Sequence, residues 1–141
     1  MEFKGMLRRV VGVGAALAAA GTMLMAPATA GAAPSSVAAD PSTSWDLVYG
    51  ATKASGTIRW HQRSADVDYT LKASYCRRLW ATPYDANYKE YPSRSTGLRC
   101  DDTSSNTLNL VVNIPGGPAH VTLCLQNEDG NRLVCEQYDR P

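Results

Sequence analysis

The sequence predicts an all-β protein, a small antiparallel β-sandwich closed by two disulfide bonds. Residues 66–75, DVDYTLKASY, and residues 107–114, TLNLVVNI, alternate strictly between apolar and polar side chains. Alternation with a period of two is typical of a half-buried strand. No segment after residue 33 shows a helical period of useful length, and the four cysteines form an even set that favours disulfides.

The first 32 residues have the features of a secretory signal peptide. Basic residues within positions 4–9 precede an apolar run over residues 10–25, and Ala28-Thr29-Ala30 fits a cleavage site, which could also follow Ala32 or Ala33. A membrane anchor is the alternative, but the run is short for a span and no basic stop-transfer segment follows it. We therefore expect a secreted, extracellular protein with no membrane association after cleavage.

Charge and length restrict the function of the mature chain. The sequence holds 14 Lys+Arg and 13 Asp+Glu, and loss of the leader removes three basic residues and one acidic residue, which leaves 11 and 12. No basic block survives, so we expect no nucleic-acid partner. The mature chain of roughly 105–110 residues is one domain by size.

An N-terminal arm is predicted over residues 33–44 and the folded domain over residues 45–141. The arm, APSSVAADPSTS, is small, polar and proline-containing, which is typical of a flexible tether. A remnant of the signal peptide without a role of its own is the alternative interpretation.

Alternation also predicts which side chains fill the core between the two sheets. Residues 45–49, 56–60 and 121–125 repeat the pattern of the two longer segments, and the pattern at residues 66–75 places Ala73 and Tyr75 on the apolar face. The predicted core consists of Trp60, Val67, Tyr69, Leu71, Leu108, Leu110, Val112, Leu123, Leu125 and Val134.

The turn signals predict strand register. Asp129-Gly130 favours a two-residue type I′ turn, because Asp-Gly tolerates positive φ at both central positions. That turn places Cys124 directly opposite Cys135, within disulfide range. The first bond is therefore Cys124–Cys135, and Cys76–Cys100 follows by exclusion. A zinc site is disfavoured, because the cysteine spacings lack a C-x-x-C unit.

Two further hairpins are predicted from turns that bring apolar faces together. A turn at Gln62-Arg63 pairs Ile58 with Val67 and Trp60 with Ala65. The segment PGGP at residues 115–118 is a turn signal that pairs residues 108–112 with residues 121–125. Residues 107–138 are then expected to form a three-stranded meander, with Leu125 opposite Val134 and Val121 opposite Tyr138.

No constellation of residues points to catalysis. His61 lies near Ser64 and Asp66, and a Ser-His-Asp triad assembled in space is the alternative to two ordinary surface histidines, of which His120 is the other. The acidic pairs at residues 66/68 and 101/102 are typical of solvated surface. We expect a protein that is not an enzyme and holds no metal or cofactor.

The segment from Trp80 to Cys100 is the candidate binding site. It contains no Val, Ile, Leu, Met or Phe before Leu98, so it cannot fill a core, yet it carries three tyrosines. A Cys76–Cys100 bond would hold it at both ends, and tyrosine and arginine are common anchors of interfaces. The predicted partner-binding residues are Trp80, Tyr84, Tyr88, Lys89, Tyr91 and Arg94. The alternative is that some of these rings form a lid over the core.

The segment GTIRWHQRSADVDYTLKASYC, residues 56–76, resembles a hairpin repeated in small secreted β-proteins of actinobacteria. Gly56, Ile58, Trp60, Arg63 and Ser64 fit its pattern, with Gln62 in place of asparagine. The leader, the arm and the two-disulfide domain also resemble the small adaptor subunit of secreted umbrella toxin particles. The resemblance implies a non-enzymatic link whose arm inserts into a large toxin subunit and whose domain holds a lectin-bearing subunit.

The first functional hypothesis is accordingly a binding or adaptor module in an extracellular protein assembly. The second is a secreted inhibitor of a trypsin-like protease or another hydrolase, because Arg94-Ser95 or Lys89-Glu90 could serve as bait in a disulfide-closed loop. Carbohydrate binding through Tyr84, Tyr88 and Trp80 is a third possibility, and a small enzyme is a fourth.

Overall fold

The computed structural model describes residues 38–141, so the predicted leader and residues 33–37 of the predicted arm lie outside the described residues. The described part of the chain contains nine strands and no helix. The strands are β1 (Ser42–Tyr49), β2 (Thr52–Trp60), β3 (Ser64–Lys72), β4 (Cys76–Tyr84), β5 (Arg94–Ser95), β6 (Arg99–Cys100), β7 (Thr103–Val111), β8 (His120–Asn127) and β9 (Arg132–Asp139).

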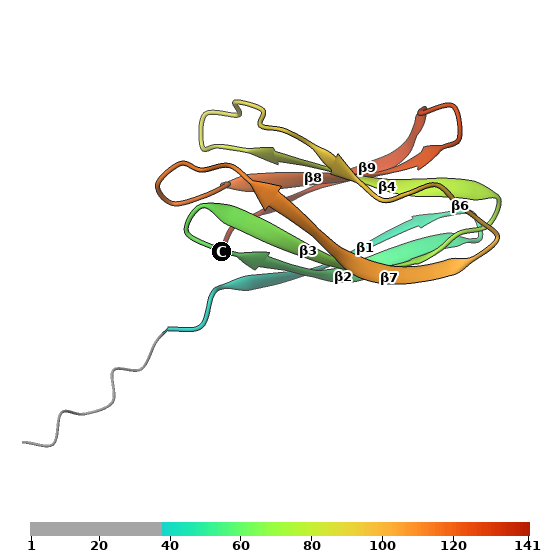
Figure 1. Cartoon of the computed structure of the whole chain (residues 1–141), viewed down its shortest axis with the longest axis horizontal. Helices are drawn as coiled ribbons and strands as arrows, with labels where there is room; N and C mark the ends of the chain where they lie inside the picture. Colours follow the sequence, from blue (N-terminus) through green and yellow to red (C-terminus); the bar gives the residue numbers. More distant parts are fainter. Residues whose placement is uncertain (1–37) are drawn as a thin grey trace, which may run out of the picture. The chain divides into compact units, whose positions relative to one another are not determined.

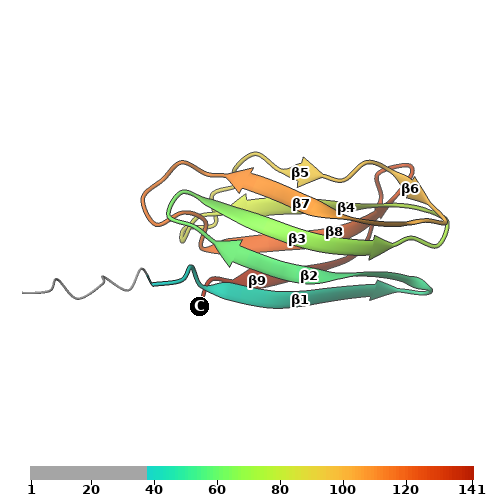
Figure 2. The same cartoon turned by 60° about the horizontal axis from the view of Figure 1, so that its bottom comes forward.

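The strands form two antiparallel sheets that pack face to face (Figures 1 and 2). The first sheet has the order β1-β2-β3-β7, and the second has the order β5-β4-β8-β9 with β6 also paired to β4. The predicted all-β sandwich with two disulfides is therefore confirmed, and the bonds are Cys76–Cys100 and Cys124–Cys135.

The core lies between the sheets and consists of the residues that alternation selects. Eight of the ten predicted core residues are buried, and the other two, Leu108 and Val134, are partly buried and pack against the cluster. The remaining large members of the cluster are Trp45, Leu47, Ile58, Leu79 and Val121. Burial of an apolar side chain of this size contributes about 1.5–3 kcal/mol, so this layer is the main source of stability.

The β2–β3 hairpin has the predicted register. Ile58 lies opposite Val67 and Trp60 opposite Ala65. Gly56 permits a very close approach of the two strands, because a Cβ atom there would lie 1.9 Å from the backbone oxygen of Asp68.

The predicted meander over residues 107–138 is wrong at its first turn. β7 pairs with β3 in the first sheet, whereas β8 pairs with β4 and β9 in the second. The PGGP segment is thus a crossover between sheets and not a hairpin turn. Apolar faces match equally well when two strands lie side by side and when they pack face to face, so alternation could not separate the two arrangements.

The β8–β9 hairpin pairs Cys124 with Cys135, Leu125 with Val134 and Val121 with Tyr138, as predicted. The predicted type I′ turn, however, is wrong. Gly130 has a φ of 83°, but Asp129 has no positive φ, and a type I′ turn requires positive φ at both positions. The register shifts between Leu125 and Gln126, and this bulge restores the predicted pairing beyond it.

Two other boundaries differ from the predictions. β3 ends at Lys72, so Tyr75 lies outside the strand and is 73% exposed, although its alternation placed it on the apolar face. β1 begins at Ser42, within the predicted arm, because Pro41 accepts a hydrogen bond from the amide of Trp60 and the residues that follow pair with β2. The ordered domain therefore starts three residues before the predicted boundary at residue 45.

Candidate functional site

The tyrosine segment, residues 80–100, begins as a strand and continues as an edge segment that runs back along that strand. Residues 80–84 belong to β4, in which Ala81 is part of the core and Thr82, on the opposite face, is buried and hydrogen-bonded to the Ser93 hydroxyl. Ser95 and Arg94 then pair with Trp80 and Ala81. The amide of Thr96 donates to the carbonyl of Leu79, and its hydroxyl accepts from the Leu79 amide. The loop proper is residues 85–93, between β4 and β5.

Asp85 closes the tip of this loop. Its Oδ1 accepts hydrogen bonds from the amides of Asn87 at 2.8 Å and Lys89 at 3.0 Å, while the Tyr88 amide donates to its carbonyl at 3.0 Å. The amide of Lys89 is the largest of the causes that hold the pKa of Asp85 below its ordinary value. The ionised carboxylate therefore fixes the turn, because it accepts amides that a neutral side chain would leave unpaired.

Tyr88 is presented by this turn and stacks on a histidine from another strand. Its φ is 59°, its side chain is 61% exposed, and its ring lies 4.5 Å from that of His120 with an interplanar angle of 6°. His120 Nδ1 lies 2.7 Å from Asp139 Oδ1, so the imidazole is fixed from its edge. A hydrogen bond from Gln137 and then one from His120 lower the pKa of Asp139. The ring of Tyr88 is therefore exposed yet held in place.

An open groove of about 680 Å³ lies beside this stack. It is lined by the loop tip at residues 85–87, by the crossover and β8 start at residues 114–120, and by the C-terminal residues 139–141. Arg140 closes its floor, because its guanidinium donates to the backbone oxygens of Gly116 and His61. The groove has the size of a ligand or peptide site.

The predicted site residues divide into exposed and half-buried sets. Tyr88, Lys89 and Arg94 are exposed, whereas Trp80, Tyr84 and Tyr91 are half-buried. The indole of Trp80 donates to Thr82 Oγ1 at 3.1 Å on the outer face of β4, next to the position of Cys124. The Lys89 ammonium lies 5.4 Å from the centre of the Tyr91 ring. The segment thus combines exposed side chains with half-buried rings on and beside β4.

Sequence reasoning did not assign His120, Asp139 or Asp85 to this site. His120 had been interpreted as an ordinary surface histidine, and its contact with Tyr88 depends on β4 and β8 being neighbours, with Tyr84 opposite His120. Because the predicted meander placed β8 beside β7, this pairing could not be found. The local signal for Asp85 is its place in a polar turn, because an aspartate there commonly accepts the main-chain amide two residues further on.

Neither histidine lies in a hydrolytic arrangement within residues 38–141. His61 is held between two carboxylates, Asp40 at 2.6 Å from Nδ1 and Asp66 at 3.1 Å from Nε2, and His120 is held by Asp139. Neither ring is hydrogen-bonded to a hydroxyl or thiol among these residues. No group of three potential metal ligands occurs in the described part of the chain.

No known protein family matches the chain, and neither a curated protein nor a solved structure is significantly similar to it. Among the residues that the structure describes, no helix is long and apolar enough to cross a membrane.

Proposed function

We propose that the chain is a secreted, non-enzymatic binding or adaptor module that links proteins in an extracellular assembly through its tyrosine segment. The observation that carries the proposal is the stack of exposed Tyr88 on His120, beside an open groove. Two disulfides are compatible with an oxidising, extracellular compartment.

The stack favours recognition because it combines exposure with low mobility. Tyrosine is enriched among residues that dominate binding energy, and a ring already held in place loses little entropy when a partner binds. Asp85 and His120 hold Tyr88 from two directions. Lys89 and Arg94 add exposed positive charge to the same segment, which would steer and orient an acidic partner.

The finer assignment is to the umbrella toxin particles whose adaptor subunit the sequence resembles. Under this proposal the partners are a large toxin subunit and a lectin-bearing subunit, and the activity belongs to interbacterial competition. The residues that carry the resemblance, Gly56 to Ser64, lie in the β2–β3 hairpin, at some distance in sequence from the tyrosine segment. The two parts can therefore be tested separately.

The test is affinity purification of the protein from culture fluid, identification of what accompanies it, and titration of that partner against variants. Tyr88→Ala should weaken binding by about 2 kcal/mol or more if Tyr88 is an anchor. Its fold should lose at most about 0.5–1.5 kcal/mol, the energy of one aromatic stack.

Tyr75→Ala is the matched control, because Tyr75 is also an exposed tyrosine but lies at the other end of β4. It should leave the partner affinity unchanged. Unchanged affinity for Tyr88→Ala, Lys89→Ala and Arg94→Ala together would contradict the proposed surface.

Inhibition of a trypsin-like protease is the second candidate function. Arg94 and Ser95 lie in β5, which is exposed and pairs only with β4 among the described strands. Its free edge could add to a strand of a protease, as extended inhibitors do. Trypsin inhibition by the protein, lost in Arg94→Ala, would favour this function over the adaptor.

A further inference from the structure

A second cluster of exposed side chains lies at the end of the sandwich opposite the tyrosine loop. In the β4–β8 ladder Arg77 pairs with Asn127 at one end, and Tyr84 pairs with His120 at the other. Seven residues at about 3.3 Å each separate the two ends by roughly 23 Å. No function discussed so far uses the residues around Arg77.

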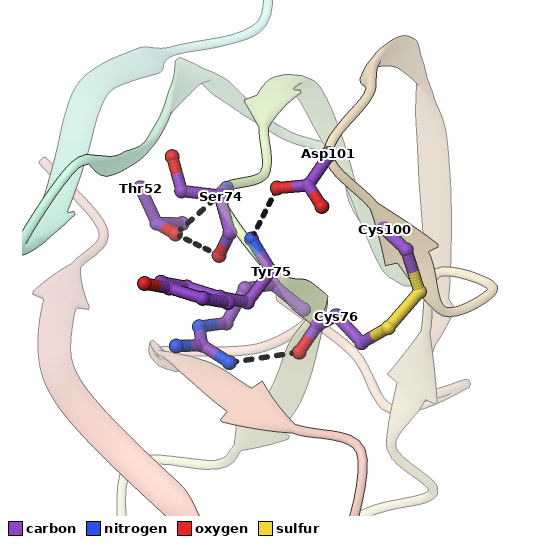
Figure 3. Close-up of a disulfide and its surroundings, with 7 residues drawn as sticks. Thr52, Ser74, Tyr75, Cys76, Cys100 and Asp101 are labelled. Carbon is purple, nitrogen blue, oxygen red and sulfur yellow. Dashed lines mark hydrogen bonds between the residues drawn. A yellow bond between two sulfur atoms is a disulfide. The ribbon is translucent and has the colours of Figure 1, made fainter.

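Tyr75 is held at this end in an unfavourable backbone conformation. Its φ is 62°, which is rare for a bulky residue. The Tyr75 amide donates to Asp101 Oδ1 at 2.7 Å (Figure 3). The Asp101 amide in turn donates to the Tyr75 carbonyl at 3.3 Å. The adjacent Cys76–Cys100 bond links β4, which begins directly after Tyr75, to β6, which ends directly before Asp101. Strain of this kind concentrates at functional sites, where the surrounding structure maintains it.

The preceding residue is fixed as well. Thr52, which is buried, accepts a hydrogen bond from the Ser74 amide and donates one to the Ser74 carbonyl, both at 3.1 Å (Figure 3). The backbone on both sides of Tyr75 is therefore rigid, while the Tyr75 side chain is 73% exposed. The fold presents this ring to solvent instead of burying it.

Arg77 lies between Tyr75 and a tyrosine of the other sheet. Its guanidinium carbon is 5.6 Å from the centre of the Tyr75 ring and 6.0 Å from that of Tyr49. Nη1 donates to the Cys76 carbonyl at 2.9 Å, whereas Nε has no hydrogen-bond partner within residues 38–141. No carboxylate of the described residues forms an ion pair with Arg77. Nε is buried, so the donor left for a ligand is Nη2, which makes no hydrogen bond within these residues.

An open pocket of about 470 Å³ adjoins this cluster. Its lining includes Tyr75, Arg77, Asp101 and Glu128. Asp101 Oδ2 and the Glu128 carboxylate accept no hydrogen bond from the described residues, so both remain acceptors for a ligand. The volume falls within the range of about 300–1,000 Å³ that is usual for small-molecule sites.

The chemistry of the lining selects the ligand. Two carboxylates disfavour an anion, the arginine disfavours a cation, and the polar rim disfavours a purely apolar ligand. A neutral sugar satisfies all three conditions, because its hydroxyls both donate and accept hydrogen bonds while the C–H face of its ring can pack on an aromatic side chain. We propose that Tyr75, Arg77, Asp101 and Glu128 form a binding site for a neutral saccharide. This site goes beyond the proposed adaptor function and does not depend on it.

The test is a titration of the ¹⁵N-labelled protein, followed by chemical-shift perturbation. The probes are glucose, galactose, mannose and N-acetylglucosamine, each to about 50 mM because one small sugar is expected to bind with a millimolar Kd. Glucuronate and glucosamine serve as charged counterparts. We expect a neutral sugar to shift the amides of residues 75–77, 101 and 127–128 in a saturable manner.

Tyr75→Asn is the decisive variant. Asparagine tolerates a left-handed backbone, so the melting temperature should stay the same or rise, while saccharide affinity should fall at least about tenfold with loss of the ring. Tyr88→Asn is the matched control, because Tyr88 is also exposed and has a φ of 59° but lies at the other end. It should leave the saccharide titration unchanged.

Three results would overturn the proposal: no saturable shift with any neutral sugar, stronger binding of a charged counterpart, or equal affinity in Tyr75→Asn. Unchanged partner affinity in the Tyr88, Lys89 and Arg94 variants, with saccharide binding intact, would contradict only the adaptor proposal, so the two proposals fail separately.

Discussion

Thr43→Val tests whether the end of the predicted arm is part of the folded domain. Thr43 lies in β1, and its Oγ1 accepts a hydrogen bond of 2.9 Å from the indole Nε1 of Trp60. Trp60 is completely buried, so water cannot replace a lost acceptor. Valine has nearly the shape of threonine and suits a strand, and the substitution therefore removes little except the acceptor.

The expected cost follows from the geometry. A buried donor left without its partner costs about 1–3 kcal/mol. The additional half-exposed methyl group of valine stabilises the fold by only a few tenths of a kcal/mol, so the loss is the larger effect. In a domain of this size the melting temperature should fall by about 4–8 °C for each kcal/mol. If residues 42–44 were a free tether, the same change would have no effect.

The assay is equilibrium urea denaturation followed by tryptophan fluorescence and circular dichroism. Thr57→Val is the matched control, because Thr57 is a half-buried strand threonine like Thr43 but its hydroxyl makes no hydrogen bond within the described residues. The control should stay within about 0.5 kcal/mol. A Thr43→Val loss no larger than that of the control would refute the coupling between β1 and the core.

Two further predictions concern the first sheet. The hydrogen bond to Asp40 is the main cause that raises the pKa of His61, and Asp66 raises it further, so the charged imidazole contributes stability below pH 6.5 that is lost as pH rises through the higher folded-state pKa. The urea midpoint of the parent protein should therefore fall as pH rises from 6.5 through that pKa, whereas the midpoint of His61→Gln should not. Parallel pH dependence of the two midpoints would contradict the role given to His61. Gly56→Ala should cost on the order of 1–3 kcal/mol or prevent folding, because its Cβ would meet the Asp68 backbone oxygen, and a thermal melt equal to that of the parent would exclude the close approach.

Local signals predicted the hairpins and the core well. The β2–β3 register follows from two apolar pairs on either side of a short turn, and the pairing of Cys124 with Cys135 survives a wrong turn type because a bulge compensates for it. Burial at Leu110 and Leu123 follows from alternation alone. These features depend on neighbouring stretches of sequence, whose geometry is set by period and turn chemistry.

Features that depend on distant strands were missed. Tyr88 stacks on His120 because β8 has β4 and not β7 as its neighbour. The pattern of apolar faces does not distinguish between these two neighbours. Alternation places Tyr75 on the apolar face because the pattern continues past Lys72, although the strand does not. Beyond the end of β3, Thr52 of β2 holds Ser74 and Asp101, between β6 and β7, holds Tyr75.

The two candidate sites share one local construction. In each, an aspartate accepts main-chain amides and an exposed tyrosine adopts a left-handed backbone: Asp85 at the Tyr88 turn and Asp101 at Tyr75. A left-handed conformation costs a bulky residue roughly 1–2 kcal/mol, which glycine or asparagine would largely avoid. A sequence adapted only for stability would therefore use those residues at both positions. Tyrosine at both positions is therefore the choice expected if the two proposed surfaces, one at each end of the β4–β8 ladder, use these rings for contact.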